Sequence, residues 1–278
     1  MARILLGFFA LLAAAYAQQS SPAELVRAAV QNQINADAHP PLFAWTQRDL
    51  HGHSTQVEHL VNTPQGIINR VVLIDDKPLN PAQRSAEEER VRKMLNPAQM
   101  RRQHKEQQED DERTRKMLSV IPNAFDFVYL GSLTGPTGHK LARIKFTPRA
   151  DFNPPSRESM VFTGMQGEII VDESCGRLAK IDGMLFKEVN FGWGILGRLY
   201  KGGRFLIEQS EVAPEHWEIT KTILHFDGKI MMLKSLHIDD NETSWDFHTV
   251  PPMSVEQALD FLARKQPEQD ARLEARPK

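Results

Sequence analysis

Hydrophobic side chains alternate with polar ones over much of the chain, and this period of two constrains the fold more than any other feature. The alternation begins after Pro122, in Phe125, Phe127 and Tyr129, and recurs in short segments as far as His248. A period of two places successive side chains on opposite faces of a strand. Because no helical segment interrupts these runs, they predict an antiparallel, meandering sheet.

Turn signals separate the predicted strands. Asp227-Gly228 divides two apolar runs and predicts a two-residue hairpin turn, because such turns need positive φ at both central positions. Residues 172–177 and 213–216 predict longer turns, and Gly52 and residues 63–66 join three further strands near the start of the chain. A sheet of about ten strands must curl. We therefore predict a mainly β (α+β) fold, built on a curled antiparallel sheet or unclosed β-barrel.

Helical signals flank this sheet. Ser21-Pro22-Ala23-Glu24 has the pattern of a capping box and predicts an N-terminal helix over residues 22–36. Residues 251–278 predict a short C-terminal helix followed by a charged tail. Residues 18–250 then form a single β domain.

A charged insertion interrupts the strands at residues 78–119. Its residues 84–118 carry ten basic and eight acidic side chains, and Asn96-Pro97 breaks the helical pattern once. The composition predicts an inserted helical hairpin that buries little surface. Two interpretations stay open: a lid or partner-binding arm, and a hairpin that faces only water.

The first residues have the three regions of a secretory signal peptide. Arg3 precedes an apolar run over residues 4–12, and Ala15-Tyr16-Ala17 supplies small residues for cleavage after Ala17. The apolar run is shorter than the roughly twenty residues that cross a bilayer. We expect residues 1–17 to be removed and the remaining chain to be exported to the periplasm.

Charge and one glycine motif exclude two classes of ligand. Lysine and arginine total 34 against 36 aspartates and glutamates, so the net charge of −2 does not favour nucleic acid as a partner. Residues 192–197 match the GxGxxG pattern, but a strand rather than a helix follows them. A dinucleotide site needs that helix. We therefore predict no nucleotide cofactor.

Catalytic and metal signals are equally weak. His51, His53 and His59 are close in sequence, but no carboxylate stands at a metal-ligand spacing from them. Cys175 lies in an acidic turn, which raises the pKa of a thiol and disfavours a nucleophile. We predict no catalytic residue, no metal and no cofactor, hence a protein that is not an enzyme. An enzyme that uses the three histidines is the weakest hypothesis.

Several strands are apolar on both faces. Leu206 stands beside Phe205 and Ile207, and apolar residues are also adjacent near Leu224. A sheet buried on one side only would show clean alternation. The second face therefore needs a cover, which can be an ordinary core under the helices or an apolar guest molecule.

Short phrases in the strands resemble a known group of carriers. They are Phe146-Thr-Pro148, the run from Gly167 to Glu173, residues 178–181 and residues 205–209. With the leader and the capped first helix, they resemble the periplasmic lipoprotein-carrier superfamily, which includes LolA-type sorting proteins, LolB receptors and the N-terminal domain of RseB. The resemblance implies an unclosed barrel whose hollow, covered by helices, binds acyl chains. The charged helices here are longer and more polar than the lids of those carriers.

These features together predict a periplasmic binding protein that holds a lipid or an acylated protein. The residues expected to line its hollow are Trp45, Phe127, Phe146, Ile207, Ile219, Leu224, Met232 and Trp245, with Phe191, Trp193 and Leu196 at its mouth. The apolar loop at the mouth also suggests peripheral contact with a membrane. The alternative is a cell-envelope interaction module that binds a protein partner through the charged helices 78–119.

Overall fold

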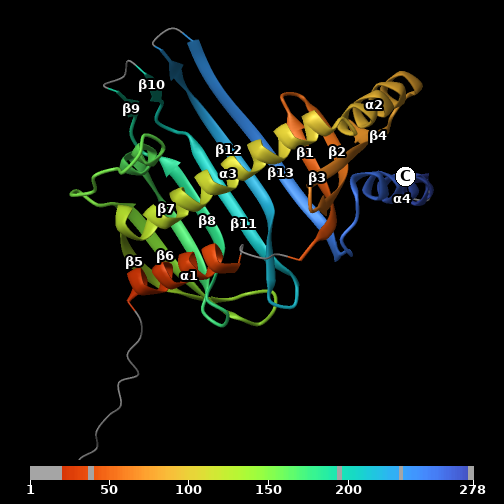
Figure 1. Cartoon of the computed structure of the whole chain (residues 1–278). Coiled ribbons are helices and arrows are strands. Elements are labelled where there is room, and N and C mark those ends of the chain that lie inside the picture. Colours follow the sequence, from red (N-terminus) through yellow and green to blue (C-terminus); the bar gives the residue numbers. More distant parts are fainter. Residues whose placement is uncertain (1–20, 37–40, 193–195, 232–233, 275–278) are drawn as a thin grey trace, which may run out of the picture.

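The protein is described by a computed structural model that covers residues 21–36, 41–192, 196–231 and 234–274. Thirteen strands in these residues form one antiparallel sheet, which is not closed into a barrel (Figure 1). The strands are β1 (Phe43–His51), β2 (Ser54–Thr63), β3 (Gly66–Ile74), β4 (Lys77–Pro78), β5 (Phe125–Thr134), β6 (Lys140–Pro148), β7 (Met165–Asp172), β8 (Arg177–Leu185), β9 (Val189–Phe191), β10 (Gly197–Leu199), β11 (Arg204–Ala213), β12 (His216–Ile230) and β13 (Lys234–Thr249).

The order of the strands is β4-β3-β2-β1-β13-β12-β11-β8-β7-β6-β5, with β9 and β10 attached to β12 off this path. The last strand of the chain, β13, pairs with the first, β1, so that Phe43 lies opposite Thr249. This pairing joins an N-terminal group of strands to the later meander. The predicted curled antiparallel sheet is confirmed.

Helices pack against both faces of the sheet. Helix α1 (Pro22–Ala36) and helix α3 (Pro97–Ala124) lie over the later strands, and α3 crosses the sheet diagonally (Figure 1). Helix α2 (Pro81–Met94) lies beside β3, helix α4 (Val255–Glu274) packs against β2 and β3, and a 3₁₀ helix, η1 (Glu158–Gly164), follows β6.

The two charged helices exist, but they do not fold back on each other as a hairpin. Helix α3 runs away from α2 across the sheet (Figure 1). Met100, near the start of α3, packs against a cluster that includes Val61 and Ile68. Ile121 and Ala124, at its end, belong to a second and larger cluster around Ile144, which we call the main core. Within α3, apolar residues stand only near the two ends, so no apolar seam runs along it for α2 to pair with.

The predicted hairpin turn at Asp227-Gly228 is wrong. Strand β12 continues through both residues to Ile230, and the chain reverses before Lys234. Gly228 is needed for a different reason, because a Cβ there would lie 2.1 Å from the carbonyl oxygen of Arg198 in the adjoining β10. The glycine allows a close approach of two backbones rather than a turn. The turns predicted at 172–177 and 213–216 are present.

A candidate ligand-binding hollow

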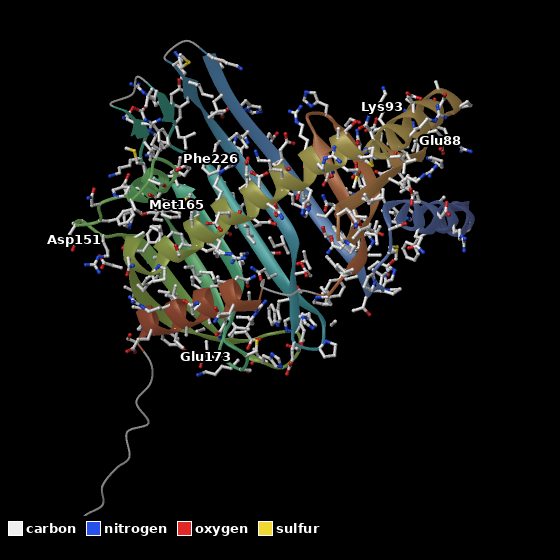
Figure 2. All side chains as sticks on the ribbon, viewed as in Figure 1. Glu88, Lys93, Asp151, Met165, Glu173 and Phe226 are labelled. Carbon is white, nitrogen blue, oxygen red and sulfur yellow. The ribbon has the colours of Figure 1, made fainter. Side chains whose placement is uncertain are left out.

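An apolar cavity of about 740 Å³ lies between α3 and the face of the sheet beneath it; we call it the apolar hollow. Its floor comes from β6, β7, β8, β11, β12 and β13, and its roof from the second half of α3 and from η1. Figure 2 labels Met165 and Phe226, two of its lining residues, close to α3. The apolar lining consists of Met117, Leu118, Ile121, Phe125, Phe146, Val161, Phe162, Met165, Ile169, Ile181, Phe191, Leu199, Phe205, Ile207, Ile219, Leu224, Phe226, Leu236 and Ile238.

Strand register explains why these side chains converge. Phe205 lies opposite Leu224 on β12 and opposite Gly183 on β8, and Ile207 lies opposite Ile181. Directly opposed residues of antiparallel strands point to the same face. The apolar positions of neighbouring strands therefore form one continuous surface under the helix. The glycine at 183 leaves room there, since a Cβ would lie 3.2 Å from the ring of Phe146.

Polar groups stand where the hollow opens. Arg113 and Thr114 of α3 line it together with Arg157 and Glu158 at the start of η1. Arg113 donates to Asp110 at 2.8 Å and remains 60% exposed. These exposed residues thus carry both charge signs, whereas most of the other lining side chains are apolar.

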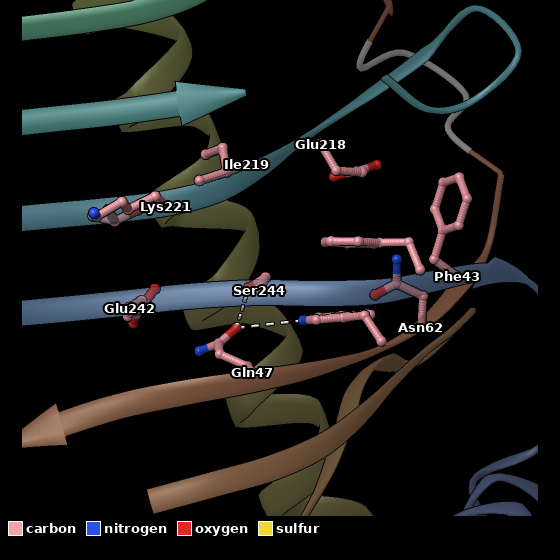
Figure 3. Close-up of a pocket in the computed structure, with 11 residues that line it drawn as sticks. Phe43, Gln47, Asn62, Glu218, Ile219, Lys221, Glu242 and Ser244 are labelled. Atoms are coloured by element: carbon pink, nitrogen blue, oxygen red, sulfur yellow. Dashed lines mark hydrogen bonds between the residues drawn. The ribbon is translucent and has the colours of Figure 1, made fainter. Parts of the chain in front are cut away.

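A smaller pocket of about 200 Å³ continues the hollow toward β1; we call it the polar slot (Figure 3). Ile219 and Thr222 line both spaces. Within the slot, Gln47 Oε1 accepts hydrogen bonds from the indole N–H of Trp45 and from the hydroxyl of Ser244, each at 3.3 Å (Figure 3). The ring of Trp45 also stacks on that of Phe247, with centroids 6.0 Å apart.

Carboxylates gather on the same face, beside the slot. Burial raises the pKa of Glu242 to about 7, and the nearby Asp240, Asp49 and Glu58 raise it further in the same direction. Burial also raises the pKa of Glu58, partly offset by a hydrogen bond from Asn69. This face is therefore acidic where Glu242, Asp49 and Glu58 lie together on β13, β1 and β2, beside the apolar hollow.

Helix α3 satisfies most of its charges within itself. Arg102 pairs with Glu106 at 2.8 Å, Lys105 with Glu109 at 3.6 Å, and Lys116 with Glu112 at 3.3 Å. These spacings of four residues bring the partners together on one helical face. The charged side of α3 is thus solvated, while its last turns direct apolar residues into the hollow.

The residues predicted to line the hollow lie in several places. Phe146, Phe191, Ile207, Ile219 and Leu224 line it, and Trp45 lines the polar slot. Phe127 packs on the main core, and Leu196 is 44% exposed. Trp245 is 41% exposed and lies opposite Thr46. Thr46 stands between Trp45 and Gln47, whose side chains line the slot, so alternation along the strand directs Trp245 to the other face of the sheet. Trp193 and Met232 lie outside the described residues.

Sequence reasoning missed the roof of the hollow. Met117, Leu118 and Ile121 stand at the end of a charged segment, and Val161 and Phe162 lie in a short 3₁₀ helix that no strand pattern predicts. The signal for the first group was present, because Met117, Leu118 and Ile121 are the first apolar residues after the charged run over residues 101–116. Their partner surface, however, is distant in sequence.

The structure places the candidate histidines and the cysteine in different surroundings. His59 is 2% exposed within β2, and His53 lies in the exposed β1–β2 turn, so these two do not share a site. Burial, and then the charge of Asp172, raise the pKa of the Cys175 thiol to about 11. A thiol with this pKa is protonated at neutral pH and is a poor nucleophile.

The GxGxxG segment has no nucleotide-binding context in the described residues. Strands β9 and β10 flank it and pair with each other, with Phe191 opposite Gly197. A helix following the motif would be required to bind a pyrophosphate. Within the described ranges, no helix has both the length and the apolarity needed to cross a membrane.

Comparisons with known proteins add one structural likeness. No protein-family model matches the chain, and no curated protein matches it. Among solved structures, the chain is similar to the crystal structure of a DUF1329 family protein from Desulfovibrio piger ATCC 29098, with 9% sequence identity and a TM-score of 0.26. The alignment covers 84% of this chain and 96% of that one.

Proposed function

We propose that this protein is a periplasmic, non-enzymatic carrier that holds an acyl chain of a lipid or of an acylated protein in the apolar hollow. The observation that carries the proposal is the size and lining of this space. Its volume of about 740 Å³ falls within the roughly 300–1,000 Å³ of small-molecule sites. Each methylene group moved there from water would contribute about 0.8 kcal/mol.

The arrangement of polar groups favours an amphiphile over a purely apolar ligand. Arg113, Arg157 and Glu158 stand at the opening, so a polar head could stay hydrated while its chain entered between α3 and the sheet. The methionines Met117 and Met165 suit variable chain shapes, because thioether side chains adapt to irregular contacts. Export to the periplasm belongs to the proposal; residues 1–17 lie outside the described residues.

The first experiment is chemical identification of the cargo. The protein would be purified from a periplasmic extract without detergent, and an organic extract of it would be analysed by mass spectrometry. We expect a stoichiometric lipid or fatty acid. A protein that is empty and also fails to bind an added fluorescent fatty acid would contradict the proposal and favour the alternative, in which the charged face of α3 binds a protein partner.

A matched pair of variants localises the binding. Ile207→Trp adds volume inside the hollow, and Val128→Trp adds the same side chain at a position that is 56% exposed on β5. We expect Ile207→Trp to weaken binding of 11-(dansylamino)undecanoic acid at least tenfold, because the added ring occupies the space of several methylenes. Val128→Trp should bind as the unaltered protein does. Equal affinities for all three proteins would place the fatty acid elsewhere.

A further inference from the structure

Two turns at the edge of the sheet bring three metal-ligating side chains together, away from the apolar hollow. His139 ends the β5–β6 turn, and Asp172 and Cys175 belong to the β7–β8 turn. Leu141 lies opposite Asp172 in the register, and the N–H of Glu173 donates to the carbonyl of Lys140 at 2.9 Å. Main-chain pairing therefore holds the two turns side by side. Figure 2 marks this corner by Glu173, next to α1.

The side chains are oriented toward one another by named contacts. Asp172 is 1% exposed, and its Oδ1 accepts from the N–H groups of Ser174 and Cys175 at 2.8 and 3.3 Å. Its Oδ2 lies 2.8 Å from Nδ1 of His139. The three ligand atoms all lie within 4.8 Å of one another.

These separations suit a single small cation. Zinc binds imidazole nitrogen at about 2.0–2.1 Å and thiolate sulfur at about 2.3 Å in tetrahedral geometry, which puts neighbouring ligand atoms about 3.3–3.7 Å apart. The 2.8 Å contact between His139 and Asp172 would need to open by roughly half an ångström. His139 is 34% exposed and stands on a turn, so its ring has room to move.

The donor set selects the class of metal. Calcium and magnesium prefer sites made of oxygen ligands, whereas one imidazole, one carboxylate and one thiolate suit zinc and its transition-metal neighbours. The neighbouring Glu173 pairs with Lys140 at 2.8 Å. Two similar histidines, His225 and His237, pair with carboxylates on β12 and β13 but have no cysteine partner there.

We propose that His139, Asp172 and Cys175 form a binding site for one zinc-class divalent ion, which links the β5–β6 turn to the β7–β8 turn. Asn32 of α1 donates to the carbonyl of Gly176 at 3.0 Å, and Arg177 donates to the carbonyl of Asn32 at 3.3 Å. The ion would therefore also stabilise the packing of α1 against the sheet. The site is independent of the acyl-binding proposal.

Cobalt(II) is the probe that tests the site. The reduced, tag-free protein, with its single thiol verified by titration, would be mixed with Co²⁺ and followed by absorption spectroscopy. We expect one equivalent to bind with a thiolate-to-cobalt charge-transfer band in the near ultraviolet. Cys175→Ser should abolish the band and His139→Gln should weaken binding more than tenfold, because each removes one ligand while changing the side-chain volume little.

The control variant is His237→Gln, which removes an exposed histidine from the β12–β13 pair. It should keep both the band and the affinity. Melting curves recorded without metal would show that Cys175→Ser and His139→Gln still fold; added Zn²⁺ should raise the melting temperature of the unaltered protein and not that of Cys175→Ser. The site would be disproved by Co²⁺ that binds without a charge-transfer band, by no binding at all, or by loss of binding in His237→Gln alone.

Discussion

At the scale of single residues, Glu242 is the group most sensitive to pH. It stands in the polar slot near three other carboxylates, and burial together with their charge raises its pKa to about 7. In the unfolded chain the same carboxyl titrates near 4.5. The folded state therefore binds this proton more tightly. The stabilisation of the folded state by the protonated Glu242 is fully present below pH 4.5 and is lost as the pH rises through about 7.

The substitution Glu242→Gln tests this account. The amide resembles the protonated acid, so it should leave stability nearly unchanged at pH 4.5 and raise the free energy of unfolding at pH 8. One pKa unit corresponds to about 1.4 kcal/mol, and solvent screening of this partly exposed group reduces the total, so we expect a gain of about 1–2 kcal/mol. Urea denaturation at both pH values measures it, with the exposed Glu215→Gln as control. A gain that is the same at both pH values would contradict the assignment.

At the scale of elements, helix α2 protects an edge of the sheet. Strand β4 pairs only with Leu73 and Ile74, so the rest of the outer side of β3 has no strand partner. Instead the N–H of Val71 donates to Glu87 Oε1 at 2.9 Å, and Arg90 donates to the carbonyl of Asn69 at 3.0 Å. Open sheet edges promote aggregation unless they are covered. The charged helix thus supplies side chains in place of another strand.

Removing Glu87 should expose this edge. Glu87 is 7% exposed, and Glu87→Ala would leave the N–H of Val71 without its acceptor. It would also remove the carboxylate partner of Arg90, which would keep only its hydrogen bonds to Asn69. We expect a loss of about 1–3 kcal/mol in the free energy of unfolding, with more aggregation on heating. Glu89→Ala, on the exposed side of the same helix, should cost no more than about 0.5 kcal/mol. Similar losses for both variants in urea denaturation would mean that the edge contact is unimportant.

At the scale of the whole molecule, α3 connects two separate cores. Its start packs with the cluster around Val61 and its end with the cluster around Ile144, while the hollow lies beneath the last part of the helix. A guest in the hollow would add contacts between the roof and the floor. Binding to the folded state alone stabilises it by mass action.

We therefore expect the fatty acid to raise the melting temperature. At a free concentration one hundred times its Kd, a ligand adds about 2.7 kcal/mol, which corresponds to roughly 5–10 °C for a chain of this size. Differential scanning calorimetry would measure the shift, and Ile207→Trp should show a much smaller one at the same concentration. An unaltered protein whose melting temperature does not respond would argue against a ligand held under α3.

The sequence alone was sufficient for the local features. Period-two alternation located most strands, the capping residues located α1, and Asn96-Pro97 located the break between α2 and α3. Of the candidate site, Ile207, Ile219 and Leu224 followed from strands that are apolar on both faces. These features depend on neighbours within a few residues, so the local pattern contains them.

Only the tertiary structure decided how distant segments meet. Phe43 pairs with Thr249, and the missing side chain of Gly228 lets β10 approach β12 closely. Met117 and Ile121 of α3 cover strands that come later in the chain. The direction of α3 followed the same rule, because the apolar residues at its end are buried over the sheet, and only Met100 at its start packs with the cluster that contains Val91 of α2. Contacts between residues far apart in the chain depend on which buried surfaces fit together, and a periodic pattern shows that a face is apolar without showing what covers it.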